Sequence, residues 1–374
     1  MKTTKLIYSV ILPFLVFVTV IISCTSESDM MPMPPVEPID TTGVESSFEN
    51  LLTNQVNEII IPTAENYQSG MENLFAVVES FVGEVNQNNF ELLRAAYLET
   101  NLAYQAAAVH NYFATANLDF VNTTNLYPVD VDSLEEFIES KTYNFNSAAQ
   151  QRANGFPAMD YLLYGLADPI ATFSDSPKTA TFLLELTRAM KERADLNVEN
   201  WTGSLRENFI NNGGLQLGSS ISVQLNEIMF YYEEHVRGNK VGIPIGRLGP
   251  NDTPFASDGT KIEAYYQSLA DENDNVALAM TRAAIAEMED IYLGTGVSGN
   301  GIGYDDLLLD IDQVSLDEDI KAQYEEIYNQ IDNRESILGD ENLYNSIQAL
   351  VTLYKSDLFP VLNVQDADGS NDGD

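Results

Sequence analysis

The sequence predicts an all-α protein with little or no sheet, built from two helical bundle domains packed side by side. Three observations lead to this prediction. From Phe48 onward, apolar residues recur at the spacing of one helix face. Helix start and stop signals, such as a capping serine, a first-turn proline or a closing glycine, bound several of these stretches. The sustained apolar–polar alternation of half-buried strands is absent from the sequence.

Composition indicates a folded and strongly acidic protein. The chain has 374 residues, 44% of them hydrophobic, which is enough for the cores of two domains. Its 57 Asp and Glu against 18 Lys and Arg give a net charge of −39. Binding of nucleic acid requires clustered basic residues that neutralise phosphates, so this charge excludes nucleic acid as a partner. A solvated acidic surface is the simplest interpretation, and attraction of cations is the functional alternative.

Residues 1–23 have the features of a secretory signal peptide. Lys2 and Lys5 precede an apolar run, and small Ser23 precedes Cys24, the chain's single cysteine. The stretch "VIISC" resembles a bacterial lipobox, which predicts lipidation of Cys24; an uncleaved membrane anchor is the alternative. Residues 24–46 are rich in Pro, Ser and acids and are expected to form a flexible tether. We therefore expect a cell-envelope protein, periplasmic or surface-exposed, that contacts the outer membrane through its lipid anchor only.

Residues 47–172 are predicted to form the N-terminal bundle. Apolar residues at helical spacing predict helices over 48–60, 67–81 and 90–113, and Ser133-x-x-Glu136 is a capping-box signature for the next helix. The stretch "NGFPAMDYLLYG" then predicts a short helix, with Pro157 at its first position and Gly165 as a left-handed C-cap. Asp160 is expected in its first turn, where the helix dipole favours a carboxylate.

Residues 173–361 are predicted to form the C-terminal bundle, followed by an acidic tail over 362–374. Its first helix starts with Ser176 as cap and Pro177 at the first position. Later helices are expected over 219–237, ended by Gly238, then from about 261 and over 275–293. A glycine-rich stretch, "GTGVSGNGIGYDD", separates these from two closing helices over 316–337 and 341–358.

Common catalytic signatures are missing from the sequence. It contains no HExxH motif, no Walker loop and no G-x-S-x-G. Its two histidines, His110 and His235, each fall late on a predicted long helix. A catalytic zinc requires three protein ligands and an open position. The two histidines and a carboxylate can supply such a set only if the fold brings them together, which their spacing does not require.

Several stretches resemble the imelysin family of helical cell-envelope proteins, first classed as metallopeptidases. "GFPAMDYLLYG" is similar to the family's "GLPALEYLLYG"-type core motif, and "NLYPVD" resembles a family segment before it. "NKVGIPIGR", "IEAYYQSLADENDNV" and "YLGTGVSGNGIGYDDLL" resemble second-half signatures, and all five occur in the family's order. The resemblance implies a two-domain helical fold, an envelope location and an association with iron uptake.

One branch of the family carries a G-x-H-x-x-E motif, proposed as a metal site. A histidine and the third residue after it share a helix face, so they can hold one cation. The aligned positions here are Gly155, Pro157 and Asp160, so the histidine is absent and the glutamate is shortened. One carboxylate does not hold a catalytic zinc by itself. These departures argue against peptidase activity and leave Asp160 as the site carboxylate.

The leading hypothesis is a non-catalytic envelope lipoprotein that binds a ligand, a metal or a partner protein at the junction of the two bundles. The resemblance points to iron acquisition, with a divalent cation or iron as cofactor and an outer-membrane iron or haem uptake protein as partner. A metallopeptidase that draws its ligands from Asp160, His110 and His235 is the first alternative. A surface adhesion or scaffold protein that uses its acidic face is the second.

For the leading hypothesis we expect a polar pocket around Asp160. Burying an ionised carboxylate requires hydrogen bonds or a counter-charge. Asp160 and Arg247, from the "GIPIGR" loop, are expected to orient a small ligand or cation, and Tyr97, Asn101 and Tyr104 are expected to form its walls. The alternative is that Asp160 only caps its own helix.

Overall fold

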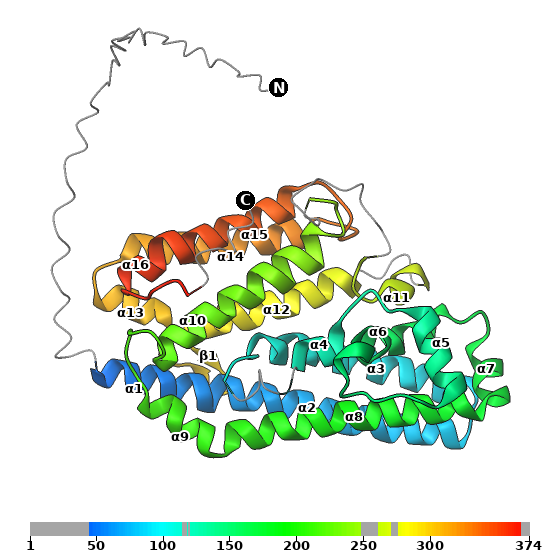
Figure 1. Ribbon diagram of the computed structural model, residues 1–374. Helices are drawn as coiled ribbons and strands as arrows, with labels where there is room; N and C mark the ends of the chain where they lie inside the picture. Colours follow the sequence, from blue (N-terminus) through cyan, green and yellow to red (C-terminus); the bar gives the residue numbers. More distant parts are fainter. Residues whose placement is uncertain (1–44, 114–117, 119, 248–260, 271–275, 368–374) are drawn as a thin grey trace, which may run out of the picture. The chain divides into compact units, whose positions relative to one another are not determined.

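The computed structural model describes residues 45–113, 118, 120–247, 261–270 and 276–367 (Figure 1). Within these ranges the chain forms helices and one two-stranded hairpin, which confirms the predicted all-α class. The elements up to residue 211 are α1 (Glu45–Asn54), η1 (Gln55–Ile60), α2 (Ile61–Gly83), α3 (Gln87–Val109), α4 (Phe120–Asn125), α5 (Val131–Ser140), η3 (Ala148–Ala153), α6 (Gly155–Asp160), η4 (Tyr161–Gly165), α7 (Pro169–Asp175), α8 (Pro177–Thr202) and α9 (Ser204–Asn211).

The remaining elements follow residue 219. They are α10 (Ser220–Tyr231), η5 (Tyr232–Gly242), α11 (Tyr265–Ala270), α12 (Val276–Leu293), β1 (Thr295–Gly296), β2 (Gly299–Asn300), α13 (Tyr304–Asp310), α14 (Val314–Asp332), α15 (Asn342–Thr352), η7 (Leu353–Leu358) and α16 (Phe359–Val361). The segments η1, η4, η5 and η7 are π-helical and continue the α-helices before them, whereas η3 is a 3-10 helix.

Helices from both halves of the sequence share one hydrophobic core. In the lower part of Figure 1, α2 lies along α3 and α8, and α12 packs on α3. The buried apolar side chains form one large cluster from Phe48 to Val364. All described residues fall in one compact unit. The division into bundles over 47–172 and 173–361 stays a prediction; α8 and α9, which follow that boundary, pack on α2 and α1.

The local signals at helix ends are partly confirmed. Ser176 caps α8, accepting a hydrogen bond from the Thr179 N–H at 3.3 Å, and Pro177 is its first residue. The predicted capping box at Ser133 is wrong, because α5 begins at Val131 with Asp130 as its cap. The Asp130 carboxylate accepts both the N–H and the hydroxyl of Ser133, at 3.1 and 2.8 Å.

Two glycines expected to cap helix C-termini do not form left-handed caps. The helix that starts at α10 runs past Gly238 as η5 and ends at Gly242. Gly165 ends η4, but neither it nor Gly238 has the positive φ of a left-handed cap. The space at Gly165 is needed instead, since a Cβ there would lie 2.6 Å from the Tyr161 ring and 2.7 Å from the Tyr266 ring. Within the described ranges, the helices are too short or too polar to cross a membrane.

We expect Leu163→Ala to lower the free energy of unfolding by about 2–5 kcal/mol, because it removes a fully buried side chain and leaves a cavity. Leu162 is equally buried, so the predicted core role of this pair is confirmed. Urea denaturation measures the change. Leu92→Ala is the matched control, since Leu92 is 55% exposed and should cost much less. Equal losses in the two variants would contradict the assignment.

Candidate functional site

Asp160 lies at the end of α6, not in its first turn. Asn154 caps this helix, its side-chain oxygen accepting the Gly155 N–H at 2.7 Å. Helix α6 therefore starts earlier than predicted, and Pro157 occupies its third position. Proline is tolerated there because the first N–H groups of a helix have no partner within it. Asp160 follows as the last residue before the π-helical turn η4.

The Asp160 carboxylate holds the start of a helix distant in sequence. One oxygen accepts the Tyr266 N–H at 2.8 Å and the other accepts the Gln267 N–H at 2.9 Å. Both donors belong to α11, about a hundred residues later. The expected link between Asp160 and the second half of the chain is therefore present. The carboxylate caps α11 rather than its own helix.

Burial dominates the acidity of Asp160. The residue is 2% exposed, and burial raises the pKa of its carboxyl from 3.8 to about 7. The two N–H donors favour the ionised form and limit the rise, whereas the nearby Glu263 adds to it. Asp160 thus changes its charge near neutral pH.

We expect the free energy of unfolding to fall relative to Asp160→Asn as the pH rises from about 4 to about 7. Over this range the folded protein keeps the Asp160 proton and the unfolded chain has released it, so raising the pH favours unfolding by about 1.4 kcal/mol per pH unit. Above pH 7 the two curves should run parallel. Urea denaturation of both proteins across this range measures the difference. A constant difference from pH 4 to 7 would contradict the raised pKa.

Asp160 forms part of the wall of a surface pocket with a volume of about 480 Å³. The other described lining residues come from the loop before α5, from α6, and from α11 with the residues just before it. They are Tyr127, Pro128, Val129, Pro157, Ile262, Ala264, Tyr265, Tyr266 and Leu269. We call this cavity the Asp160 pocket. Tyrosine rings and aliphatic side chains make most of its wall, and Asp160 supplies a charge.

A buried polar cluster forms around Glu263, whose chain neighbours Ile262 and Ala264 line this pocket. Lys240, from η5, forms an ion pair with Glu263, and the two side chains are 4% and 2% exposed. Gln105 joins them: its amide N–H donates to Glu263 at 2.7 Å, and its oxygen accepts from the Lys240 ammonium at 2.6 Å. Asn125 also donates to Glu263. The cluster therefore ties α3 and α4 to η5 and the segment before α11.

Tyr97, Asn101 and Tyr104, which were predicted to form the pocket walls, all lie in α3 and are buried. Asn101 accepts from Gln105 at 2.9 Å and donates to the Tyr97 hydroxyl at 3.4 Å, so these two extend the Glu263 cluster. The Tyr104 ring packs on Phe156 at 5.3 Å. Its hydroxyl is buried without a hydrogen-bond partner among the described residues. These side chains are absent from the described wall of the Asp160 pocket.

Arg247 takes a different place from the one expected. It forms an ion pair with Glu341 at 3.7 Å and lies over the Tyr344 ring, and its side chain is 47% exposed. It is absent from the described wall of the Asp160 pocket. Lys240, seven residues earlier in the same quoted stretch, is the cation that reaches the interior. The one signal in the sequence that could have pointed to Lys240 is its position in "NKVGIPIGR", a stretch that resembles the family.

The predicted metal ligands Asp160, His110 and His235 each contact different partners. His110 is buried and its Nε2 lies 2.5 Å from a Glu287 carboxylate oxygen. His235 lies on η5, and its Nδ1 contacts the Asn239 amide at 3.3 Å; burial lowers the pKa of His235 to about 4. Across the described ranges, no three or more His, Cys, Asp or Glu side chains are arranged to hold a metal ion. Asp160, His110 and His235 therefore do not form one ligand set.

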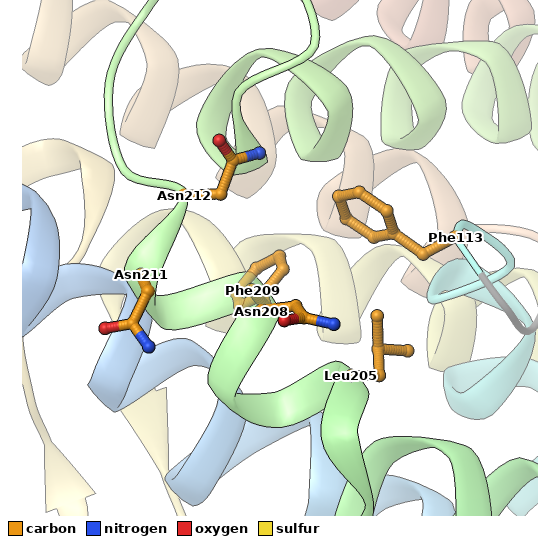
Figure 2. A pocket seen from close by; sticks show the side chains of 6 residues that line it. All are labelled: Phe113, Leu205, Asn208, Phe209, Asn211 and Asn212. Carbon is orange, nitrogen blue, oxygen red and sulfur yellow. The ribbon is translucent and has the colours of Figure 1, made fainter.

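A smaller cavity of about 350 Å³ opens beside α9 (Figure 2). Its described wall consists of Phe113, Leu205, Asn208, Phe209, Asn211 and Asn212. In Figure 2, Phe113 and Leu205 lie on one side of the view and Asn211 and Asn212 on the other, with the remaining two residues between them. Side chains that titrate are absent from this described wall. The Asp160 pocket therefore offers the stronger chemistry.

The comparisons with known proteins agree with this arrangement. The family model described as imelysin (Peptidase_M75) matches residues 60–356. An imelysin-like protein from Psychrobacter arcticum 273-4 is similar in structure, with a TM-score of 0.69 at 15% identity, covering 86% of this chain and 98% of that one. A candidate iron-regulated protein A precursor from Parabacteroides distasonis ATCC 8503 has a TM-score of 0.66 at 14% identity, covering 83% and 94%.

No curated protein matches the sequence. At these identities the two solved structures establish the likeness of the fold alone. The family model spans most of the described chain, including the Asp160 pocket and the Glu263 cluster. This chain therefore belongs to the imelysin family.

Proposed function

We propose that this protein is a non-catalytic binding protein that takes a small ligand in the Asp160 pocket. The observation that carries the proposal is Asp160 itself: a buried carboxylate that joins a helix of the first half to α11 and also faces a cavity. A cavity with a mostly apolar wall and a few placed polar groups is the usual form of a ligand site.

The residues at the family's motif positions support a role without catalysis. The Pro157 side chain has no atom that can ligate a metal, and both Asp160 oxygens accept backbone N–H groups. A metallopeptidase site needs three protein ligands around its metal. We therefore expect no hydrolysis of fluorogenic peptides in the presence of Zn²⁺, Mn²⁺ or Fe²⁺. Metal-dependent turnover that Asp160→Asn abolishes would overturn this part of the proposal.

A pocket-filling variant tests the binding role. Leu269 lines the Asp160 pocket and is 60% exposed, so Leu269→Trp should fill the cavity without disturbing the core. In a thermal-shift screen of small molecules, compounds that raise the melting temperature of the wild type should lose their effect on Leu269→Trp. Leu92→Trp, at an exposed site on α3, is the matched control. Compounds that stabilise all three proteins equally would argue against this pocket.

We propose that the protein is located in the cell envelope and takes part in iron acquisition. The name of the Parabacteroides relative, which refers to iron regulation, supports this context, as does the family. An outer-membrane iron or haem uptake protein is the partner we propose. A deletion strain should then grow more slowly than its parent only when iron is limiting. A scaffold role on the acidic face predicts instead that growth is independent of iron supply.

Lipidation at Cys24 is proposed as the means of attachment, although Cys24 lies outside the described residues. We expect wild-type protein to partition into the detergent phase and Cys24→Ala to move to the aqueous phase after signal cleavage. Phase separation in a nonionic detergent, followed by immunoblotting, measures this. Cleaved Cys24→Ala that stays in the detergent phase would contradict the anchor.

A further inference from the structure

The wall of the Asp160 pocket has one sign of charge. Among its described lining residues, Asp160 is the one that carries a formal charge, and Lys, Arg and His are absent from that wall. Three tyrosines, Tyr127, Tyr265 and Tyr266, make its aromatic part. A cavity of this composition favours a positive ligand over a negative one, because an anion would meet a carboxylate in a partly apolar site.

Among the described residues, no cationic side chain is paired with the Asp160 carboxylate. Its oxygens accept two neutral N–H groups, which satisfy hydrogen bonds but leave the net charge in place. Glu263 is a carboxylate that raises the pKa of Asp160, and its own ion-pair partner is Lys240. Ionised Asp160 is therefore a buried charge that hydrogen bonds stabilise without a counter-ion among the described residues. A cation bound in the pocket would offset the cost of burying this charge.

The aromatic wall suits an organic cation. The Tyr265 and Tyr266 rings meet edge to face, with their centres 5.0 Å apart. Aromatic faces attract ammonium groups, and tyrosine cages are a recurrent way to bind quaternary ammonium. Tyr127 also lines this wall, and its hydroxyl is buried without a hydrogen-bond partner among the described residues.

A bare metal ion fits this wall less well. Hard divalent cations take six or more oxygen ligands. The described wall offers one carboxylate, and the described residues contain no group of three or more acidic, His or Cys side chains that could hold an ion. An ammonium group needs only one counter-charge and the ring faces around it.

We infer that the Asp160 pocket binds a small organic cation, with the Asp160 carboxylate as counter-ion and the tyrosine rings as walls. This inference rests on the proposed function, since it names the chemical class of the ligand in that pocket. The strongly negative chain, with a net charge of −39, would also raise the local concentration of cations.

Binding of a cation should release the proton of Asp160. Tyr97 and Tyr266 face Asp160 along with Glu263; burial keeps the pKa of both phenols above their usual value, so they stay neutral near pH 7. A cation prefers the ionised carboxylate, so its affinity should rise by up to tenfold per pH unit until about pH 7 and then level off. A neutral ligand should show no such rise.

Three probes of one shape separate the possibilities. Choline, 3,3-dimethylbutan-1-ol and 3,3-dimethylbutanoate have nearly the same shape and carry one positive charge, no charge and one negative charge. We expect titration of the full-length mature protein, followed by calorimetry and NMR, to show choline binding most tightly and with the stated pH dependence. Asp160→Asn should abolish the pH dependence and most of the affinity for choline. Asp168→Asn, which alters an exposed cap of α7, should change neither.

The outcomes distinguish this inference from the proposed function. If the alcohol or the carboxylate binds as tightly as choline, and Leu269→Trp blocks it, the pocket is a binding site but its ligand is not a cation. If no probe binds, or choline binds equally to wild type and Asp160→Asn, the cation inference is wrong. If Mn²⁺ displaces choline from wild type and binds far more tightly, the ligand is a metal ion. Binding that Leu269→Trp leaves unchanged would count against the pocket itself.

Discussion

Replacing Gly155 with alanine is expected to lower the free energy of unfolding by on the order of 3–5 kcal/mol. Gly155 has a φ of +65°, a conformation that costs an L-residue with a side chain about 1–2 kcal/mol. A Cβ at this position would also lie 2.0 Å from the carbonyl oxygen and 2.5 Å from the carbonyl carbon of Thr124. These are backbone atoms of α4, so no side-chain rotation relieves the overlap.

The relief must come from a shift of α6 or α4. Movement of α6 would displace Asn154, which caps it, and Asp160 at its far end. We therefore expect Gly155→Ala to weaken any ligand binding at Asp160 in addition to destabilising the fold. The first residue of the family motif is a glycine. In this chain a glycine is needed there because the backbones of α6 and α4 approach too closely for a side chain.

Gly83→Ala is the matched control for this prediction. Gly83 ends α2, and a Cβ there would meet nothing within 4 Å. Alanine is also the better helix former, so this variant should be neutral or slightly stabilising. Urea denaturation of both variants and the wild type measures the two changes. A loss below about 1 kcal/mol for Gly155→Ala would show that α6 can adapt, contrary to the close packing.

Much of the fold could be predicted because it depends on local patterns. The periodic apolar residues of α2, α3 and α14 specify both a helix and its buried face. Predicted ends failed where long-range packing decided them. The chain runs through Gly238 as η5 because a helix continues past glycine when its neighbours pack well, and no residue signal marks a π-helical turn.

Of the candidate site, only the place of Asp160 could be predicted from the sequence, and that prediction came from the resemblance to the family motif. Lys240 and Glu263 were missed because their partnership depends on how η5 meets the segment before α11, which no spacing rule describes. Arg247 was expected at the pocket for its charge alone. The structure brings in Lys240 instead, whose ammonium reaches buried Gln105. Sequence periodicity shows which side of a helix is buried, and it does not show which buried polar groups will meet.

Glu263→Gln is expected to lower the free energy of unfolding by about 3–5 kcal/mol, because it leaves the Lys240 ammonium buried without its counter-charge. Lys240→Met should be similarly costly, since it leaves the Glu263 carboxylate with only amide donors from Gln105 and Asn125. A buried ion pair is not stabilising in itself, because both charges lose their hydration. The free energy of unfolding falls most when one of the two charges stays buried without the other.

The double variant Lys240→Met/Glu263→Gln tests this reasoning. It contains neither charge, so it should be more stable than the sum of the single losses predicts, by about 1–3 kcal/mol of coupling. A surface pair is the control: Lys178 and Glu139 are 37% and 79% exposed, and Glu139→Gln should cost less than about 1 kcal/mol. Urea denaturation of the four proteins of the cycle measures the coupling, and additive losses would contradict a buried ion pair.

The same substitution should also alter the acidity of Asp160. Glu263 raises the pKa of the Asp160 carboxyl, so Glu263→Gln removes that repulsion. The loss of this repulsion favours ionised Asp160, and the pKa of its carboxyl should fall below about 7. NMR titration of the Asp160 carboxyl in wild type, Glu263→Gln and the double variant measures this, with both variants expected to lie below the wild type because both lack the Glu263 charge. An unchanged pKa in Glu263→Gln would mean that the cluster and the pocket are electrostatically independent, and that burial alone sets the charge of Asp160.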